Sequence, residues 1–384
     1  MLKDVKLKKA LKSTIFPVLS FINKFIPKND KYVMLYSANK GLRHNLVPLK
    51  DYMLKEGYDK KYKILCAVES MEYAGNEEGV KYIPQLLAML YFFVTKHVYY
   101  TTGQIPIKPS RKQCVVMLDH GTASYKTAGV WSNINNGDSF YFTHYTAPSP
   151  IYVPIYQQQY LCKEENMVVN GEPVNDIFFQ PYEKYDLGDF KKVGVWAPTF
   201  RQSDYLGYDD SSEDLIPMFT QEDYEELNEE LRKRNIKLMA KLHQGQSLQN
   251  YKQRHFSNLE LYSDDEFRAK GYELYTLLKQ SDFLVADYSS VPLQYLLLNK
   301  PILYAIPDIE EYKQRRGFVF ENVLDYMPGA KVNTKEGLYA FLDAMAEDRD
   351  EYKEERERVC GIIHAYRDGD NSRRALEIGQ VTMP

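Results

Sequence analysis

The stretch that decides the fold is SDFLVADYSSVP, residues 281–292, in which a short apolar run ends on an acid, a tyrosine and two serines. Such a run, followed by polar residues where a strand would turn into a helix, is typical of a buried parallel strand. Open parallel sheets bind ligands at the carboxyl ends of their strands. Asp287, Ser289 and Ser290 are therefore expected at a ligand-binding edge.

Similar apolar runs alternate with amphipathic stretches along most of the chain, which predicts parallel sheets covered by helices. A chain of 384 residues is long enough for two such α/β domains. We place them at residues 29–185 and 186–350, with a basic helix at 1–28 and helices at 351–384 that pack back on the first domain. The strand-like runs are KYVMLYS (31–37), KYKILCAVE (61–69), HVYYTT (97–102), KQCVVMLDHG (112–121), DSFYFTH (138–144), VGVWAPTF (193–200), IKLMAKLHQ (236–244) and PILYAIP (301–307).

The N-terminal segment is basic, although the whole chain has a formal charge of -4. Residues 1–30 carry seven lysines and two aspartates. Lysines occupy other faces than the apolar residues, which recur at helical spacing: Leu7, Leu11, Ile15, Val18 and Ile22. This pattern is typical of an amphipathic helix that lies on an anionic bilayer. It also fits a surface helix whose apolar stripe docks on the first domain.

Cysteine spacing, apolar stretches and charge argue against several classes of protein. The four cysteines lie far apart, with no CxxC or CxxH spacing, so a zinc site or disulfide framework is not predicted and a reducing cytosol fits. No apolar stretch reaches the roughly 18 residues that a membrane-spanning helix needs. No signal-peptide cleavage site follows the N-terminal lysines. The acidic body argues against nucleic-acid binding.

In the first domain, the segment LDHGTASYKTAG (118–129) follows an apolar strand. His120 would lie at the strand end, and its ordinary pKa near neutral pH suits a general base that acts on a hydroxyl. Gly121 allows close approach of the backbone, and Thr122 can donate a hydrogen bond. A packing or capping histidine is nevertheless the simpler explanation of an isolated His-Gly pair.

In the second domain, four successive strand ends carry polar residues. Hydroxyls at a helix N-terminus, together with cationic side chains from neighbouring strand ends, favour a phosphate. Helix capping alone would explain the two serines, but it does not explain why cations arrive from the other strand ends. The residues are Thr199, Arg201, Lys241, His243, Asp287, Ser289, Ser290, Arg316 and Gly317.

In this order, the segments resemble the CDP-glycerol glycerophosphotransferases of teichoic acid and capsule synthesis. A series of ordered matches over about residues 115–375 carries the resemblance. HGTASYKTAG (120–129) is similar to HGT-xx-K-x-G, VNGEPVND (169–176) to GxPRxD, APTFR (197–201) to APTWR, KLHQ (241–244) to KxHP, residues 281–321 to the run ADxLITDYSS, nKPiifY, D-x-x-x-Y and RGF, and RDGDNSRRA (367–375) to DGxASxR.

The resemblance implies a GT-B fold, in which two Rossmann-like domains face a cleft that holds the active site. It implies that His120 is the base for the acceptor hydroxyl and that His243 is a second essential histidine near the donor phosphates. No DxD-like acidic pair follows a strand, so we expect neither a metal nor a cofactor. The donor pyrophosphate would be held by Thr199, Ser289, Ser290, Arg316 and Gly317, with support from Arg201, Lys241, Asp287 and Lys126, and with Gly121 and Thr122 on the acceptor side.

Four positions depart from the family pattern. Val174 replaces the arginine of GxPRxD, Gln244 the proline of KxHP, and Ala123 the proline after HGT. Asp119, before His120, is also atypical and would raise the pKa of that histidine if its carboxylate pointed the same way. Because Val174 removes the arginine of this motif, the resemblance does not specify the acceptor or the alditol of the donor.

The short chain resembles the primases of the family, which add one glycerol phosphate from CDP-glycerol to an undecaprenyl-pyrophosphate-linked glycan. Such an enzyme would lie peripherally on the cytoplasmic face of the membrane through residues 1–28. The alternatives are a CDP-ribitol or other alditol-phosphate transferase or polymerase, and a nucleotide-sugar GT-B glycosyltransferase. A membrane-bound scaffold or nucleotide-binding protein with an inactive site is a further alternative.

Overall fold

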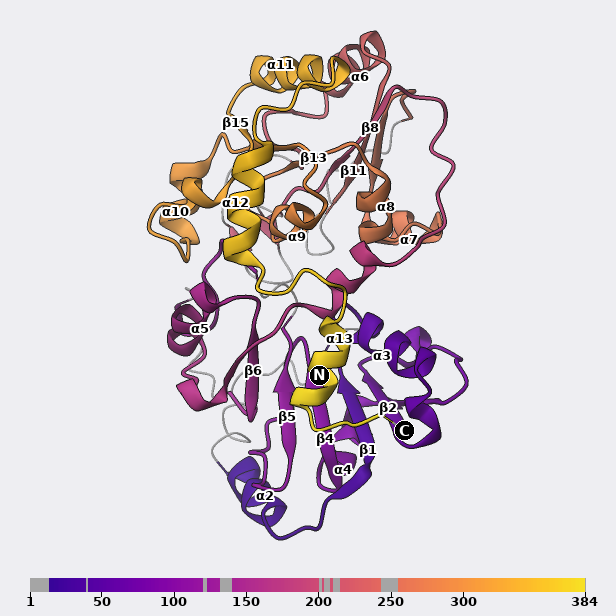
Figure 1. Ribbon diagram of the computed structural model, residues 1–384, viewed down its shortest axis with the longest axis vertical. Coiled ribbons are helices and arrows are strands. Elements are labelled where there is room, and N and C mark those ends of the chain that lie inside the picture. Colours follow the sequence, from indigo (N-terminus) through magenta and orange to yellow (C-terminus); the bar gives the residue numbers. More distant parts are fainter. Residues whose placement is uncertain are drawn as a thin grey trace. The chain divides into compact units, whose positions relative to one another are not determined.

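The computed structural model describes residues 14–38, 41–119, 123–131, 140–199, 202–203, 208–209, 215–242 and 255–383. They form two compact units, each built on a parallel sheet with helices on its faces (Figure 1). The first unit takes the described residues of 1–122, 135–179 and 364–384, and the second takes those of 123–134 and 180–363. The predicted α/β fold with two Rossmann-like parallel sheets is confirmed.

The first unit has a seven-stranded sheet in the order β3-β2-β1-β4-β5-β6-β7. The chain starts in the middle and changes direction between β1 and β4, as in a Rossmann fold. The strands are β1 (Asn29–Tyr36), β2 (Lys63–Val68), β3 (Val80–Pro84), β4 (Thr95–Tyr100), β5 (Cys114–Met117), β6 (His144–Ala147) and β7 (Met167–Val169). The helices are α2 (Ile15–Asn23), α3 (Leu46–Lys55), α4 (Gln85–Phe92), α5 (Val153–Gln159) and α13 (Asn371–Ile378).

The second unit has a six-stranded sheet in the order β12-β11-β8-β13-β14-β15. Counted from its own first strand, β8, this is again the Rossmann order, with the change of direction between β8 and β13. The strands are β8 (Lys192–Trp196), β11 (Ile236–Lys241), β12 (Leu259–Tyr262), β13 (Phe283–Ala286), β14 (Ile302–Ala305) and β15 (Ala330–Val332), beside a ribbon of β9 (Gln202–Ser203) and β10 (Tyr208–Asp209). The helices are α6 (Tyr224–Lys233), α7 (Asp264–Ala269), α8 (Leu274–Gln280), α9 (Val291–Tyr295), α10 (Ile309–Arg315), α11 (Lys335–Ala346) and α12 (Lys353–Ile363).

The core of the second unit packs directly on β8 and β13. Gly194 in β8 pairs in register with Phe283 in β13. A Cβ atom on Gly194 would lie 2.2 Å from the Phe283 ring, so only glycine leaves room for this aromatic side chain. Trp196 and Phe219 add an edge-to-face pair to the same buried cluster. The packing fixes the two strands side by side and therefore brings their carboxyl ends together.

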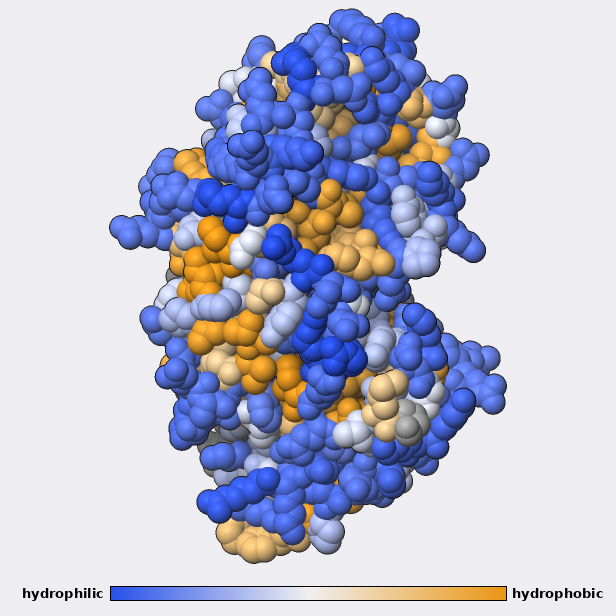
Figure 2. Space-filling view, viewed as in Figure 1, coloured by the Kyte–Doolittle hydropathy of each residue, from blue (hydrophilic) through white to orange (hydrophobic). Residues whose placement is uncertain are grey.

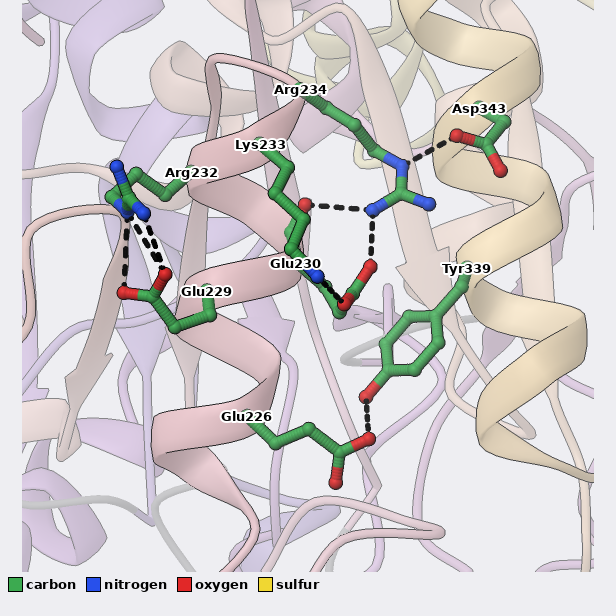
Figure 3. Close-up of polar contacts among 8 residues, drawn as sticks. All are labelled: Glu226, Glu229, Glu230, Arg232, Lys233, Arg234, Tyr339 and Asp343. Atoms are coloured by element: carbon green, nitrogen blue, oxygen red, sulfur yellow. Dashed lines mark hydrogen bonds and ion pairs between the residues drawn. The ribbon is translucent and has the colours of Figure 1, made fainter.

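Charged side chains join α6 to α11 on the surface of the second unit (Figure 3). The Arg234 guanidinium contacts Glu230 on α6 at 2.6 Å and Asp343 on α11 at 2.7 Å. The Tyr339 hydroxyl donates to Glu226 at 3.0 Å. Lys233 and Arg234 together lower the pKa of the Glu230 carboxyl. This half-buried network joins the two helices that cover the sheet.

The two units differ from the predicted ranges in which chain segments they contain. Residues 123–131 belong to the second unit, because the segment pairs with residues 316–319 there. Helix α12 also belongs to the second unit, since buried Arg356 binds Asp350 and Asn299. The last helix, α13, packs in the core of the first unit through Ala375 and Leu376.

Asp176 holds the start of α13 from a distant part of the chain. Its buried carboxylate accepts hydrogen bonds from the backbone N–H groups of Asn371 at 2.9 Å and Ser372 at 2.8 Å. It thereby satisfies two N–H groups that a helix start leaves without intrahelical partners. Burial raises the pKa of Asp176 to about 6, although these hydrogen bonds lower it. The GxPRxD-like and DGxASxR-like segments are therefore parts of one structural contact.

Replacing Asp176 by Asn should destabilise the chain by about 1 to 3 kcal/mol, because the amide cannot accept from both N–H groups. Folded Asp176 holds its proton up to about pH 6, whereas in the unfolded chain the group loses it near its ordinary pKa of 3.8. Wild type should therefore exceed Asp176→Asn in free energy of unfolding by less and less as pH rises from about 3.8 to 6. Above about pH 6 the difference should stay constant. Urea unfolding of both proteins between pH 4 and 8 measures this difference. A difference that grows with pH over the same window would contradict the assignment.

Candidate active site

Asp287 ties together the ends of the two central strands of the second unit. Its carboxylate is fully buried and accepts the backbone N–H of Thr199, at 3.1 Å to Oδ1 and 2.9 Å to Oδ2. Oδ1 also accepts the N–H of Ser289 at 3.1 Å. Thr199 follows β8 and Ser289 follows β13, so the contact lies where the strand order changes direction. Nucleotides bind in Rossmann folds at this point.

Asp287 is therefore a structural residue at the centre of the site. A buried carboxylate that accepts backbone N–H groups fixes the loop geometry in the way that a helix cap does. Its two oxygens face Thr199 and Ser289. These contacts show that Asp287 positions the loop, and its predicted contact with the donor stays a prediction.

Ser289 and Ser290 follow Asp287 at the start of α9, and both are half-buried. The Ser289 hydroxyl donates to the carbonyl of Ala197 at 3.4 Å. Ser290 occupies the N-cap position, but within the described part of the chain its side chain makes no capping hydrogen bond to α9. Capping by the side chain therefore does not explain Ser290, which leaves its hydroxyl suited to a ligand.

The tyrosine between Asp287 and Ser289 anchors this loop to a second segment. Tyr288 is fully buried, and its ring stacks on Tyr312 with centroids 4.4 Å apart. Its ring also packs on Phe318 at 5.4 Å, and its hydroxyl donates to Asp308 at 3.0 Å. The DYSS, D-x-x-x-Y and RGF segments therefore meet in one buried cluster. The sequence alone predicts no role for Tyr288, Asp308 or Tyr312, although all three lie within the motifs that carry the family resemblance.

Arg316 and Gly317 end α10 beside this cluster. The backbone N–H groups of both residues donate to the carbonyl of Tyr312, at 2.8 Å and 3.3 Å. Gly317 has a φ of +81°, a left-handed conformation that favours glycine at a helix end. Lys126 forms an antiparallel bridge with Phe318. The structure thus pairs the segment that carries Lys126 with the segment that carries Arg316, although the two residues come from different halves of the sequence.

Lys241 ends β11 and forms an ion pair within the second unit. Its Nζ lies 2.9 Å from Asp264 on α7 and 5.8 Å from the centroid of the Phe267 ring. The helix that supplies Asp264 begins with a capping box, in which Ser263 and Glu266 bind each other's backbone N–H groups. Lys241 therefore has a carboxylate partner beside the sheet, and its predicted contact with a donor phosphate stays a prediction.

In the first unit, Asp119 follows β5 directly before His120. Asp119 has a left-handed φ of +55°. Its carboxylate accepts hydrogen bonds from the hydroxyls of Tyr145 and Tyr160, whose rings stack 4.6 Å apart. Burial and the charge of Asp119 raise the pKa of both tyrosines well above 10. The carboxylate is thus held by two phenols, and its predicted effect on the pKa of His120 remains untested.

A buried amide links this strand end to the GxPRxD-like segment. Asn45 donates to the carbonyls of Leu118 and Asp119 at 3.1 Å and 2.9 Å, and accepts the N–H of Val174 at 3.0 Å. The Val174 side chain is itself buried, so this position adds no charge to the surface of the first unit. His120, Gly121, Thr122, Arg201, His243 and Gln244 lie outside the described residues.

Comparison with known proteins agrees with the motif pattern. Residues 18–378 match the family model described as CDP-Glycerol:Poly(glycerophosphate) glycerophosphotransferase. The chain belongs to this family. The matched region includes both Rossmann-like units and every predicted site residue.

Members of this family and solved structures are similar to this chain. It is 24% identical over 404 residues to the teichoic acid poly(ribitol-phosphate) polymerase of Bacillus spizizenii, covering 97% of this chain and 60% of the polymerase. It is 31% identical over 204 residues to the teichoic acid glycerol-phosphate primase of Bacillus subtilis, covering 51% of this chain and 48% of the primase. The structure of the wall teichoic acid polymerase TagF superposes with a TM-score of 0.72 at 17% identity, covering 97% of this chain and 94% of that one. The chain thus spans about 60% or less of the length of these two relatives.

Replacing Asp287 by Ala should destabilise the second unit by about 2 to 4 kcal/mol, because two buried N–H groups would lose their acceptor. Ser290→Ala is the matched control in the same loop, and its stability should stay within about 0.5 kcal/mol of wild type. Urea unfolding measures both. Equal stabilities of Asp287→Ala and wild type would show that the carboxylate does not hold the strand ends.

Proposed function

We propose that this chain transfers glycerol phosphate from CDP-glycerol to a hydroxyl of an undecaprenyl-pyrophosphate-linked glycan, with release of CMP, as a primase does. No metal or cofactor takes part in the proposed reaction. The observation that carries the proposal is the arrangement around Asp287, where Thr199, Ser289 and Ser290 gather at the change of strand order. Membership of the glycerophosphotransferase family supports a CDP-linked donor at this point.

The proposed reaction needs a base and charge stabilisation. The acceptor hydroxyl attacks the β-phosphorus, which bears the alditol, and the bond between this phosphorus and the bridging oxygen breaks as CMP leaves. His120 takes the hydroxyl proton, and His243 acts near the donor phosphates. Hydroxyls of Ser289 and Ser290 with the guanidinium of Arg316 stabilise the phosphate charge, because such transfers depend on positioning and electrostatics rather than on covalent chemistry.

Incubation with CDP-glycerol, CDP-ribitol and UDP-sugars, with mass analysis of the product on a short lipid-linked acceptor, tests the donor. We expect one glycerol phosphate added from CDP-glycerol and the same rate in the presence of EDTA. His120→Ala and His243→Ala should each lower transfer about 100-fold or more. Wild-type rates in both variants would overturn the catalytic assignment, and transfer from a UDP-sugar alone would overturn the proposed reaction.

A ribitol-phosphate transferase or polymerase is the second candidate. The similarity to the ribitol-phosphate polymerases of Bacillus spizizenii and Staphylococcus aureus extends over 97% of this chain, whereas that to the Bacillus subtilis glycerol-phosphate primase extends over 51%. The same donor screen separates these candidates. Ribitol phosphate in the product, or several units added per acceptor, would favour the second candidate.

We also propose that the chain binds peripherally to the cytoplasmic face of the membrane. No helix in the described ranges is long and apolar enough to cross a bilayer. Apolar side chains gather around α2 in the first unit (Figure 2), and Phe25 beside it is 71% exposed. On α4, Leu86 and Leu90 are also exposed. Gln113 links α2 to α4. It accepts a hydrogen bond from Asn23 of α2 and donates one to the carbonyl of Phe92 at the end of α4.

An exposed basic segment lies against α2. The segment 108–112 is held against α2 by a hydrogen bond from the N–H of Lys108 to the Ser20 hydroxyl at 2.9 Å. It exposes Lys108, Arg111 and Lys112. Exposed apolar residues with basic ones beside them fit an anionic bilayer surface, and the lysines of residues 1–12 would add to the attraction.

The double variant Phe21→Asp, Phe25→Asp should lose about tenfold or more of its binding to anionic liposomes, because two exposed aromatic side chains would no longer enter the bilayer. Leu161→Asp is the control, since Leu161 is an equally exposed apolar residue of the first unit that lies outside α2 and α4. Sedimentation with vesicles measures binding, and transfer to a soluble acceptor should be unchanged. Equal losses in both proteins would contradict a specific membrane surface.

A further inference from the structure

Residues 125–127 form a strap across the segment that carries Arg316. The N–H of Val319 donates to the carbonyl of Tyr125 at 2.8 Å, and the N–H of Thr127 donates to the carbonyl of Gly317 at 3.3 Å. With the bridge between Lys126 and Phe318, these contacts make a short antiparallel pair. The strap therefore fixes the backbone of the Arg316 segment along three consecutive residues.

The side chain of Thr127 adds the contact nearest to Arg316. Its hydroxyl donates to the carbonyl of Arg316 at 2.7 Å, and Thr127 itself is buried. Its methyl group lies 3.3 Å from the place where a Cβ of Gly317 would stand. Thr127 thus packs against the left-handed turn at Gly317, and its hydrogen bond fixes the orientation of the Arg316 carbonyl.

The far end of the strap is anchored separately. Tyr125 is fully buried, and its hydroxyl donates to the carbonyl of Tyr326 at 2.8 Å. On the other side of the Arg316 segment, the ring of Phe318 packs against Tyr288, beside Ser289. The segment that carries Arg316 is therefore held on one side by the strap and on the other by Tyr288, the neighbour of Ser289 in the chain.

We propose that Thr127 is a positioning residue for the donor, which it serves by orienting Arg316 toward the donor phosphate. This inference rests on the proposed function, in which Arg316 binds that phosphate. The hydrogen bond from the Thr127 hydroxyl holds the backbone of Arg316, whose guanidinium would bind the donor phosphate. Its loss should therefore weaken binding of the donor more than binding of the acceptor. The proposed positioning of Arg316 depends on the hydroxyl of Thr127, because this group donates the hydrogen bond to the Arg316 carbonyl.

Steady-state kinetics of three variants with CDP-glycerol and CDP-ribitol test the proposal. Thr127→Val keeps the shape and removes the hydroxyl, and its KM for the donor used by wild type should rise about 3- to 10-fold, the usual effect of one hydrogen bond. Its KM for the acceptor should stay unchanged, and Thr127→Ser should restore the donor KM. Tyr125→Phe is the control, because it removes the buried hydrogen bonds of the Tyr125 hydroxyl with the Tyr326 carbonyl and the Tyr304 hydroxyl but leaves the Arg316 carbonyl bound.

The outcomes separate this proposal from the proposed function. No transfer from either CDP-alditol by wild type overturns the proposed function and this inference with it. Active wild type with an unchanged donor KM in Thr127→Val overturns the positioning role alone. An equal rise of KM in Tyr125→Phe and Thr127→Val overturns it too, since loosening of the whole strap would then explain the effect.

Discussion

The buried carboxylate of Asp287 is the contact on which the candidate site depends. It costs free energy to bury a charge, and backbone N–H groups from Thr199 and Ser289 offset this cost by charge-assisted hydrogen bonds. The same bonds determine where the chain leaves β8 and β13. The residues proposed to hold the donor phosphate are therefore positioned by a residue that faces the protein backbone.

The family motifs are linked to one another by buried contacts. Tyr288 joins the serine loop to Tyr312 and Phe318, so the DYSS segment and the arginine segment cannot move independently without unstacking aromatic rings. In the first unit, Asp176 joins the GxPRxD-like segment to the start of α13. Residues that looked like separate ligand-binding signals in the sequence thus include several that maintain the scaffold.

Much of the fold follows from the sequence, because alternating apolar and amphipathic runs specify parallel strands and covering helices. The apolar run before Asp287 predicts a strand that ends there, and β13 confirms it. Its contacts could not be read from the sequence, because they depend on Thr199, a residue 88 positions away. The same limit applies to Asp119, whose carboxylate binds Tyr145 and Tyr160, and to residues 123–131, which pack in the second unit. Long-range packing decides each of these cases, and local pattern carries no information on it.

A crystal structure of the chain with bound CDP would test the central claim most directly. The account predicts that the pyrophosphate lies at the ends of β8 and β13, within hydrogen-bonding distance of Ser289 or Ser290, with Asp287 still bound to the N–H of Thr199. A nucleotide bound at the ends of β1 and β4 in the first unit, with the serine loop empty, would contradict it.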